Sequence, residues 1–193
     1  RDIGVTGVQT CALPICASSW PRETGMIDFE PGFLPALAGS AAVAIVVAGA
    51  GGFMTDTGPW YRSLKFPAWK PPDWAFGPIW TLVLVCATFG AAKGLQAAPD
   101  DQTYWQSVAV LGVNAGLNIL WNALFFAMRR PDWAFAEVVI FWLSILAVMG
   151  VIGSHAPIAA LYFLPYLLWV GIASVLNWKI VMLNRPFGTF QHD

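Results

Sequence analysis

Long stretches without a charged side chain constrain the fold of this chain more than any other feature. They cover residues 31–55, 74–92 and 102–128, and another lies between Val138 and Lys179, where only His155 interrupts the apolar run. A helix of about 20 apolar residues crosses the hydrocarbon core of a bilayer, so the first three stretches fit one helix each and the last fits two. The sequence therefore predicts an all-α integral membrane protein, a bundle of five transmembrane helices.

We expect the spans at residues 33–54, 75–96, 104–128, 133–153 and 158–183, within one membrane domain covering residues 26–193. Residues 1–25 are expected to be non-native or disordered, because residues 5–15 resemble translated sequencing adapter and Met26 is the first methionine. Acidic Asp28 and Glu30 precede the first span, unlike the basic start of a signal peptide, so we expect that span to be retained.

Charge excludes several functions. Only 11% of the residues are charged and the net charge is -1, so a basic nucleic-acid surface is not expected. The sequence shows no metal-ligand cluster, nucleophile–base pair or phosphate loop, so we predict neither a metal site nor a conventional catalytic site. The two histidines, His155 and His192, lie away from the tryptophan-rich loop, so haem there would lack a proximal histidine.

Basic residues predict the orientation. With five spans, the loop after the first span, the loop after the third and the C-terminus share one face. That face collects Arg62, Lys65, Lys70, Arg129, Arg130, Lys179 and Arg185, whereas Arg22 and Lys93 fall on the other. The positive-inside rule places the basic face and the C-terminus in the cytoplasm and the N-terminus outside.

Residues 69–80, WKPPDWAFGPIW, predict a rigid aromatic lid at the basic end of the bundle. Indole rings offer flat apolar faces, which suit a flat and mostly apolar ligand. Trp80, Trp121 and Trp169 lie about two turns or more inside their spans, deeper than headgroup anchors. Trp60, Trp74 and Trp178 fit either role, as headgroup anchors or as pocket residues.

The third span carries Asn114, Asn118 and Asn122 on one helical face, which we expect to point into the bundle. Asn114 and Asn122 fit interhelical hydrogen bonds, whereas Asn118, close to Trp121, is the ligand candidate. Gly112 in the same span forms a GxxxG pair with Gly116, which favours a homodimer but also suits internal packing.

The fifth span places four residues on one stripe, either a cavity wall or ordinary aromatic packing: Tyr166, Trp169, Ala173 and Asn177. Pro165 predicts a kink there. Glu137 lies one turn inside the fourth span, where an acid can mark a functional site, but we favour its pairing with Arg129 or Arg130 across the turn or its hydration at the interface. In the first span, the small residues Ala44, Ala48 and Gly52 predict close helix approach.

Several motifs together resemble the TspO/MBR family, which comprises the tryptophan-rich sensory proteins and the mitochondrial translocator protein, or peripheral benzodiazepine receptor. They are Trp60-Tyr61, WKPP at 69–72, FGPIW at 76–80, Asn118 through Trp121 to Phe125-Phe126, PYLLW at 165–169 and Leu176-Asn177. The resemblance covers residues 26–185. It implies a five-helix bundle, usually dimeric, with a pocket beside the first loop that binds porphyrins, haem, sterols and isoquinoline- or benzodiazepine-type drugs.

The resemblance also implies which residues line that pocket: Tyr61, Pro71, Trp80, Asn118, Trp121, Trp133, Tyr166, Trp169 and Ala173. The chain departs from the family at Leu84, where tyrosine is frequent. Residues 175–182 also lack the tyrosine of the sterol-recognition pattern proposed for animal members, a weak pattern in any case.

We therefore expect a tetrapyrrole-binding membrane protein with a regulatory or sensory role and no required cofactor, porphyrin or haem being its ligand. The alternatives are transport of porphyrin or sterol, and light-dependent porphyrin degradation, for which Trp80 and Trp169 match the pair implicated in the family. The expected partners are tetrapyrrole, sterol or drug-like ligands, membrane lipid and a second copy of the chain. We expect a bacterial cell membrane rather than the mitochondrial outer membrane.

Overall fold

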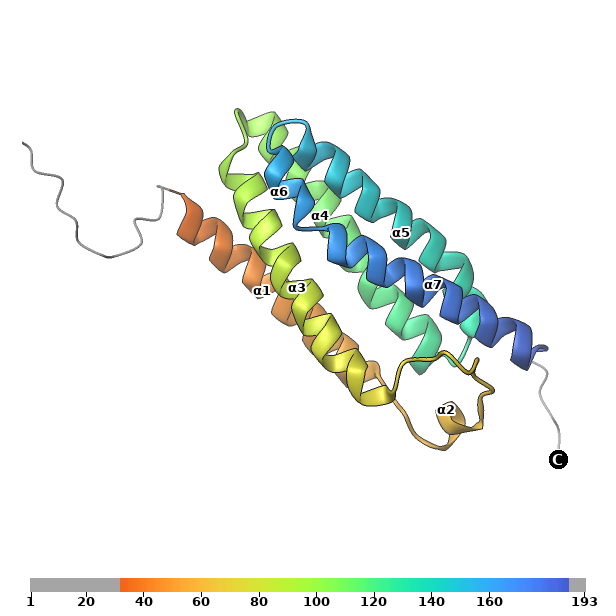
Figure 1. The fold of residues 1–193 in the computed structure, drawn as a ribbon. Coiled ribbons are helices and arrows are strands. Elements are labelled where there is room, and N and C mark those ends of the chain that lie inside the picture. Colours follow the sequence, from red (N-terminus) through yellow and green to blue (C-terminus); the bar gives the residue numbers. More distant parts are fainter. Residues whose placement is uncertain (1–31, 188–193) are drawn as a thin grey trace, which may run out of the picture.

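A computed structural model describes residues 32–187, and within that range five apolar helices are long enough to cross a membrane. The spanning helices are α1 (Phe33–Met54), α3 (Asp73–Gln96), α4 (Asp101–Asn122), α5 (Pro131–Gly153) and α7 (Leu164–Asn184), and the short helices are α2 (Pro59–Ser63) and α6 (Pro157–Leu161) (Figure 1). The predicted all-α bundle of five transmembrane helices is confirmed. The predictions for residues 1–25 lie outside the described residues.

The bounds of the helices lie close to those predicted from the sequence, with two local differences. The third span ends in a π-helical turn, η1 (Ala123–Ala127), directly after α4. The fifth span is interrupted at Tyr162 and Phe163, where α6 stops and α7 begins with Pro165 in its first turn. Proline has no N–H to continue the ladder from α6, so the predicted kink is a complete break between two helices.

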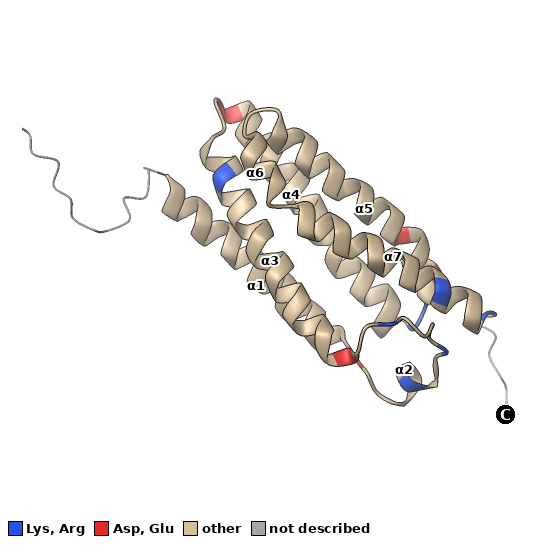
Figure 2. Ribbon diagram, in the orientation of Figure 1, with Lys and Arg blue, Asp and Glu red and all other residues tan. Residues whose placement is uncertain are grey.

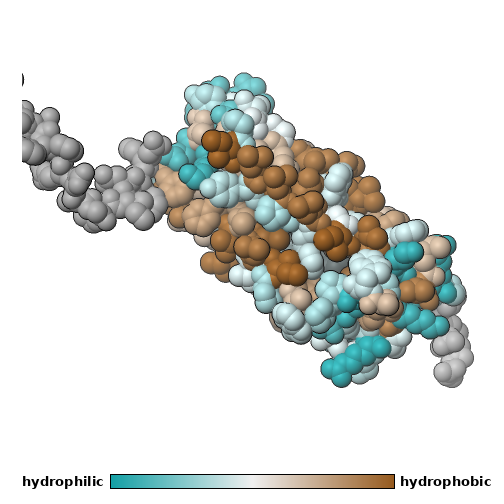
Figure 3. All heavy atoms as spheres, in the orientation of Figure 1, coloured by the Kyte–Doolittle hydropathy of each residue, from teal (hydrophilic) through white to brown (hydrophobic). Residues whose placement is uncertain are grey.

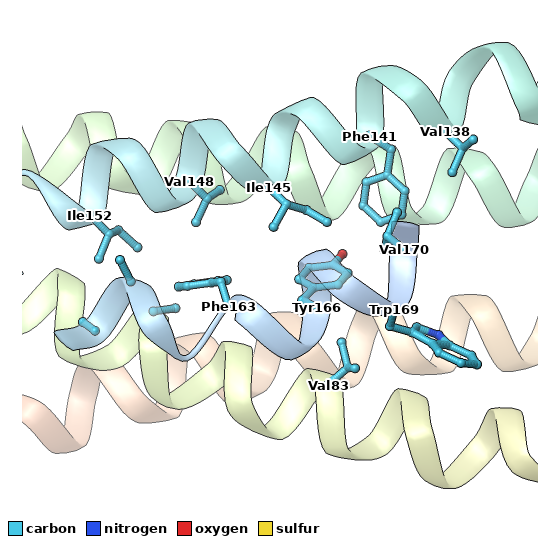
Figure 4. Packing of buried hydrophobic residues seen from close by; sticks show 13 residues of the cluster. Val83, Val138, Phe141, Ile145, Val148, Ile152, Phe163, Tyr166, Trp169 and Val170 are labelled. Atoms are coloured by element: carbon cyan, nitrogen blue, oxygen red, sulfur yellow. The ribbon is translucent and has the colours of Figure 1, made fainter. Parts of the chain in front are cut away.

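Helix α1 lies at the edge of the bundle. It packs mainly on α3 and to a lesser extent on α4, while α5 packs on α4 and α7 (Figure 1). Only Phe33 and Val47 of α1 are buried. The main core instead joins α3, α5 and α7 through residues such as Val83, Phe141 and Val170 (Figure 4). Helix α1 therefore covers a bundle whose core forms largely without it.

Charged residues gather at the two ends of the bundle. Most lysines and arginines lie at the end that carries α2 and the C-terminus of α7, and Lys93 lies at the opposite end near Asp100 and Asp101 (Figure 2). Between these ends the visible surface is dominated by hydrophobic residues (Figure 3). The grouping of the basic loops agrees with the sequence, and the orientation in the membrane stays a prediction.

Candidate functional site

A cavity of about 770 Å³ lies beneath the C-terminal half of α1. Residues of α1, α3, α4 and α7 surround it, and Thr57 and Tyr61 close it from the α1–α3 loop. Its walls carry the rings of Tyr61, Phe76, Trp80, Phe89, Trp121, Phe126 and Trp169. We call it the aromatic cavity.

Small residues of α1 leave the space for this cavity. Ala44, Ala48, Gly51 and Gly52 all line it. A Cβ atom added at Gly52 would have no neighbour within 4 Å. The stripe Ala44, Ala48 and Gly52 therefore lines a cavity, although α1 packs closely on α3 elsewhere along its length.

The roof of the aromatic cavity is held by a polar cluster. The hydroxyl of the buried Tyr61 donates to Oδ1 of Asp73 at 3.2 Å. Lys70 forms an ion pair with Asp73 and lies over the Phe66 ring, 4.6 Å from its centroid. Burial raises the pKa of Tyr61 above its ordinary value, and the charge of Asp73 raises it further, so the phenol stays neutral and keeps donating.

Three helices bring their rings together around the aromatic cavity. Phe76 of α3 meets Trp169 of α7 edge to face, with centroids 5.6 Å apart. In α4, Trp121 stacks on Phe125 of the π-turn at 5.3 Å. The indole N–H groups of Trp121 and Trp169 are buried and donate to no protein atom within residues 32–187. Most buried donors have a partner, so these two are unusual.

The structure brings six of the nine predicted ligand residues to the aromatic cavity: Tyr61, Trp80, Asn118, Trp121, Trp169 and Ala173. Tyr166 lies behind this wall. Its hydroxyl accepts from Nδ2 of Asn118 at 2.9 Å, and its ring packs edge to face against Trp80. Part of the polar capacity of Asn118 is therefore used inside the protein.

The other two predicted residues, Pro71 and Trp133, are not brought to the cavity. Trp133 lies in the first turn of α5 with 51% of its surface exposed, and the Arg130 guanidinium lies over its ring, 4.5 Å from the centroid. The first turn of α5 thus presents this ring outward. Ligand contact by Pro71 and Trp133 stays a prediction from the family resemblance.

Sequence reasoning missed the lining contributed by α1 and by Asp73, which among residues 32–187 is the only charged residue on the wall of the aromatic cavity. It also missed Phe76, although that residue opens the motif ending at Trp80. A signal existed for α1 in its alanines and glycines. That signal does not distinguish a tight helix contact from an open one.

A second cavity, of about 630 Å³, lies beneath the N-terminal half of α1. It reaches Gln96 and Tyr104 at the α3–α4 end, and its other end shares Ala44, Val47, Leu84 and Thr88 with the aromatic cavity. We call it the aliphatic cavity. The two cavities are therefore stacked end to end under α1.

The surroundings of Glu137 differ from those that the sequence predicted. Arg130 forms a two-point pair with Asp132 at 2.8 and 2.5 Å, and Arg129 lies 4.0 Å from Asp56, so both arginines have other partners. Glu137 is only 7% exposed, and neither carboxyl oxygen has a hydrogen-bond partner within residues 32–187. Pairing of Glu137 with these arginines is therefore wrong, because the nearer Asp132 occupies Arg130 and Asp56 lies beside Arg129. Hydration of Glu137 stays a prediction.

The described histidine lies far from the aromatic cavity in the sequence and at the other end of the bundle. His155, between α5 and α6, places Nε2 3.0 Å from the Gly94 carbonyl oxygen. Within residues 32–187 no group of three or more His, Cys, Asp or Glu side chains is arranged to hold a metal ion.

Comparison with known proteins places this geometry in context. The profile of the TspO/MBR family matches residues 40–183. Protein CrtK of Rhodobacter capsulatus is 33% identical over 142 residues, which cover 74% of this chain and 89% of the relative. A tryptophan-rich sensory protein of Cereibacter sphaeroides is 33% identical over 129 residues, 66% of this chain and 79% of the relative. The translocator protein of Homo sapiens is 28% identical over 127 residues, 63% and 72% of the two chains.

Proposed function

This chain belongs to the TspO/MBR family of multi-pass membrane proteins, and we propose that its aromatic cavity binds a tetrapyrrole, either a porphyrin or haem, in a sensory or regulatory role. The name of the Cereibacter sphaeroides relative supports the sensory part of this proposal. The ligand class rests on the cavity itself.

The observation that carries the proposal is the convergence of three indole rings on one apolar space. Trp80, Trp121 and Trp169 come from three different helices and line a cavity of about 770 Å³. Cavities of roughly 300–1,000 Å³ accommodate drug-sized ligands. A planar conjugated macrocycle is wide enough to contact several of these rings at once and offers them a flat face for stacking.

Charge suggests how the ligand would be oriented. Protoporphyrin carries two carboxylates on one edge, and an anion is costly at membrane depth. Lys70 lies at the roof, where it pairs with Asp73 on the cavity wall. We propose that the carboxylate edge faces the roof and competes with Asp73 for Lys70, while the ring system lies below among the indoles.

Titration with protoporphyrin IX tests the proposal. Tryptophan fluorescence of the purified protein should be quenched saturably, and the double variant Trp80→Phe, Trp169→Phe should bind more weakly. Trp105→Phe is the matched control, because Trp105 is 65% exposed and lines neither cavity. Unchanged affinity in a folded double variant would reject the site. The single variant Trp133→Phe decides whether this ring contributes.

The role of Lys70 has a separate test. Lys70→Met should weaken binding of protoporphyrin IX but not of its dimethyl ester, which has no carboxylate charge. Lys65→Met, an exposed lysine of the same loop, is the control. Equal losses of affinity for the acid and the ester would show that Lys70 only stabilises the roof through its ion pair with Asp73.

A second candidate function is transport, and the stacked cavities favour it. Together they extend from the α1–α3 loop to the α3–α4 end and share four residues. A ligand could pass between them only if the wall at Val47 and Leu84 moved. Reconstituted vesicles should then show a porphyrin flux that the double variant Trp80→Phe, Trp169→Phe reduces. Transport would be rejected if the wild-type protein binds porphyrin but its vesicles show no more flux than vesicles with the double variant.

We further propose a homodimer in a bacterial cell membrane, with the N-terminus outside and the C-terminus in the cytoplasm. Gly112 and Gly116 lie on an exposed face of α4, and a Cβ added at either would meet nothing within 4 Å. This glycine pair is therefore not used to pack the chain internally. The mass of the protein in nanodiscs, compared with that of Gly116→Leu, tests the dimer, and cysteine accessibility from each side tests the orientation.

A further inference from the structure

Basic side chains outnumber acidic ones at the end of the bundle that carries α2 and the C-terminus of α7 (Figure 2). Three ion pairs use the aspartates described there: Asp56 with Arg129, Asp73 with Lys70, and Asp132 with Arg130. Within residues 32–187, four further basic side chains at this end form no ion pair: Arg62, Lys65, Lys179 and Arg185. This end therefore carries positive charge that no described acid neutralises.

The last turns of α7 place two of these cations against exposed apolar side chains. Trp178 and Met182 are four residues apart, so they lie on the same helical face, and they are 41% and 49% exposed. The Lys179 ammonium lies over the Trp178 ring, 4.6 Å from its centroid. A guanidinium N–H of Arg185 donates to Sδ of Met182. We call these four residues the α7 strip.

The end of α7 is tied to the α1–α3 loop through Asn184, the last residue of the helix. Its Oδ1 accepts from the backbone N–H of Lys65 at 2.8 Å, and its Nδ2 donates to the backbone carbonyl of Lys65 at 2.9 Å. The backbone of Lys65 therefore lies beside Arg185, and a third cation without an ion pair adjoins the α7 strip.

The surroundings of the α7 strip indicate which anion it suits. Helix α7 belongs to an apolar span that ends here, so Trp178 and Met182 lie where hydrocarbon meets the headgroups. An anionic phospholipid offers a phosphate to the cations and glycerol and acyl carbons to the apolar side chains. A soluble phosphate would use the cations alone and leave Trp178 and Met182 uncovered. A zwitterionic lipid also carries an ammonium group, which two cations repel.

We propose that the α7 strip binds one anionic phospholipid, such as a phosphatidylglycerol, with its phosphate between Lys179 and Arg185 and an acyl chain over Trp178 and Met182. Each cation near an anionic lipid strengthens binding about fivefold, so the two should together give about a twentyfold preference over a zwitterionic lipid. The strip lines neither the aromatic nor the aliphatic cavity, so this site is independent of the tetrapyrrole proposal.

Native mass spectrometry of the full-length protein tests the proposal. The protein is titrated with phosphatidylglycerol and with phosphatidylcholine, both carrying palmitoyl and oleoyl chains. One phosphatidylglycerol per chain should bind about twentyfold more tightly than phosphatidylcholine. Lys179→Gln and Arg185→Gln should each lose about fivefold of this preference, and the double variant should bind the two lipids about equally. Equal binding of the two lipids by the wild-type protein would overturn the proposal.

The matched control is the double variant Arg62→Gln, Arg129→Gln, which removes the same charge from the same end of the bundle. Nε of Arg62 donates to the Thr57 carbonyl at 3.2 Å, and Arg129 lies 4.0 Å from Asp56, so both side chains lie near the end of α1 rather than at α7. This control should keep the preference of the wild type. Equal losses in the two double variants would overturn the proposal, because diffuse charge would then explain the binding.

Inorganic phosphate distinguishes a lipid site from a site for soluble anions. At millimolar concentration it should displace no more phosphatidylglycerol than potassium chloride does at the same ionic strength. The double variant Trp178→Ala, Met182→Ala, which keeps both cations, should weaken the binding of phosphatidylglycerol. Specific displacement by phosphate, or full affinity in this apolar variant, would overturn the lipid assignment and identify a site for soluble phosphate.

Discussion

Helix α3 faces two very different neighbours. Toward α5 and α6 it is packed without space: a Cβ added at Gly90 would lie 2.7 Å from the Phe163 ring and 2.9 Å from the Ala159 carbonyl oxygen, and one at Gly94 would lie 2.7 Å from Ile152. Toward α1 it borders both cavities. Glycines of α1 such as Gly39 and Gly52 line those cavities, and an added Cβ there meets nothing within 4 Å.

This contrast shows how one small bundle combines rigidity with space for ligands. The tight side, formed by α3 with α5, α6 and α7, holds most of the buried core and fixes the positions of Trp80 and Trp169. The open side is covered by α1, whose small residues leave room instead of filling it. Glycine therefore has opposite roles on the two sides, close packing on one and open volume on the other.

The most damaging change should be Gly90→Val on the tight side. The Ala159 carbonyl is backbone and cannot move aside, so overpacking should cost about 1–3 kcal/mol or more. The midpoint of thermal unfolding in detergent should fall clearly. Gly49→Val on α1 is the control and should leave the midpoint almost unchanged. Equal midpoints for the two variants would remove the contrast between the sides.

A smaller loss is expected for Tyr166→Phe, at the wall that separates the cavities. The substitution keeps the ring but removes the oxygen that accepts from Nδ2 of Asn118. A buried donor left without an acceptor costs about 1–3 kcal/mol. Thermal unfolding measures this loss, and Tyr104→Phe, on a residue that is 39% exposed, should show much less. A Tyr166→Phe variant as stable as wild type would mean that the hydrogen bond does not hold the wall.

The smallest effect should come from Asp100→Ala, at the end of the bundle away from the α1–α3 loop. Oδ1 of Asp100 accepts from the Thr103 backbone N–H at 2.7 Å at the start of α4, and this bond lowers the pKa of Asp100. A lowered pKa contributes stability above the unfolded-state value and loses it as pH falls through the folded-state value. At pH 7 the variant should unfold at a slightly lower temperature than the wild type, and this difference in the unfolding midpoint should vanish in acid. A difference that persists in acid would exclude the carboxylate as its cause.

Much of the fold followed from uncharged length alone, because lipid permits few alternatives to helices. The predicted bounds of α1, residues 33–54, match the structure, and Pro165 marked the break in the fifth span correctly. What the sequence could not give was the separation between helices. The stripe containing Ala44 and Gly52 is compatible with tight packing or with a cavity, and the structure shows it on the wall of the aromatic cavity.

The candidate site shows the same limit. Depth within the spans was enough to identify Trp80, Trp121 and Trp169 as inward rings, all of which line the aromatic cavity. The predicted pairing of Glu137 with an arginine failed because pairing across a short turn depends on which acid an arginine reaches first, and Asp132 is two residues from Arg130. The aliphatic cavity had no sequence signal, since its walls are ordinary apolar helix residues.

The central claim is that the two spaces under α1 are separate and that only the one beneath the α1–α3 loop takes a tetrapyrrole. Protoporphyrin IX quenching of Gly52→Leu and Gly39→Leu, with Gly49→Leu as the shared control, tests it most directly. Filling the aromatic cavity at Gly52 should abolish saturable quenching, whereas filling the aliphatic cavity at Gly39 should leave the affinity at the control value. Full affinity in Gly52→Leu, or its loss in Gly39→Leu, would contradict the account.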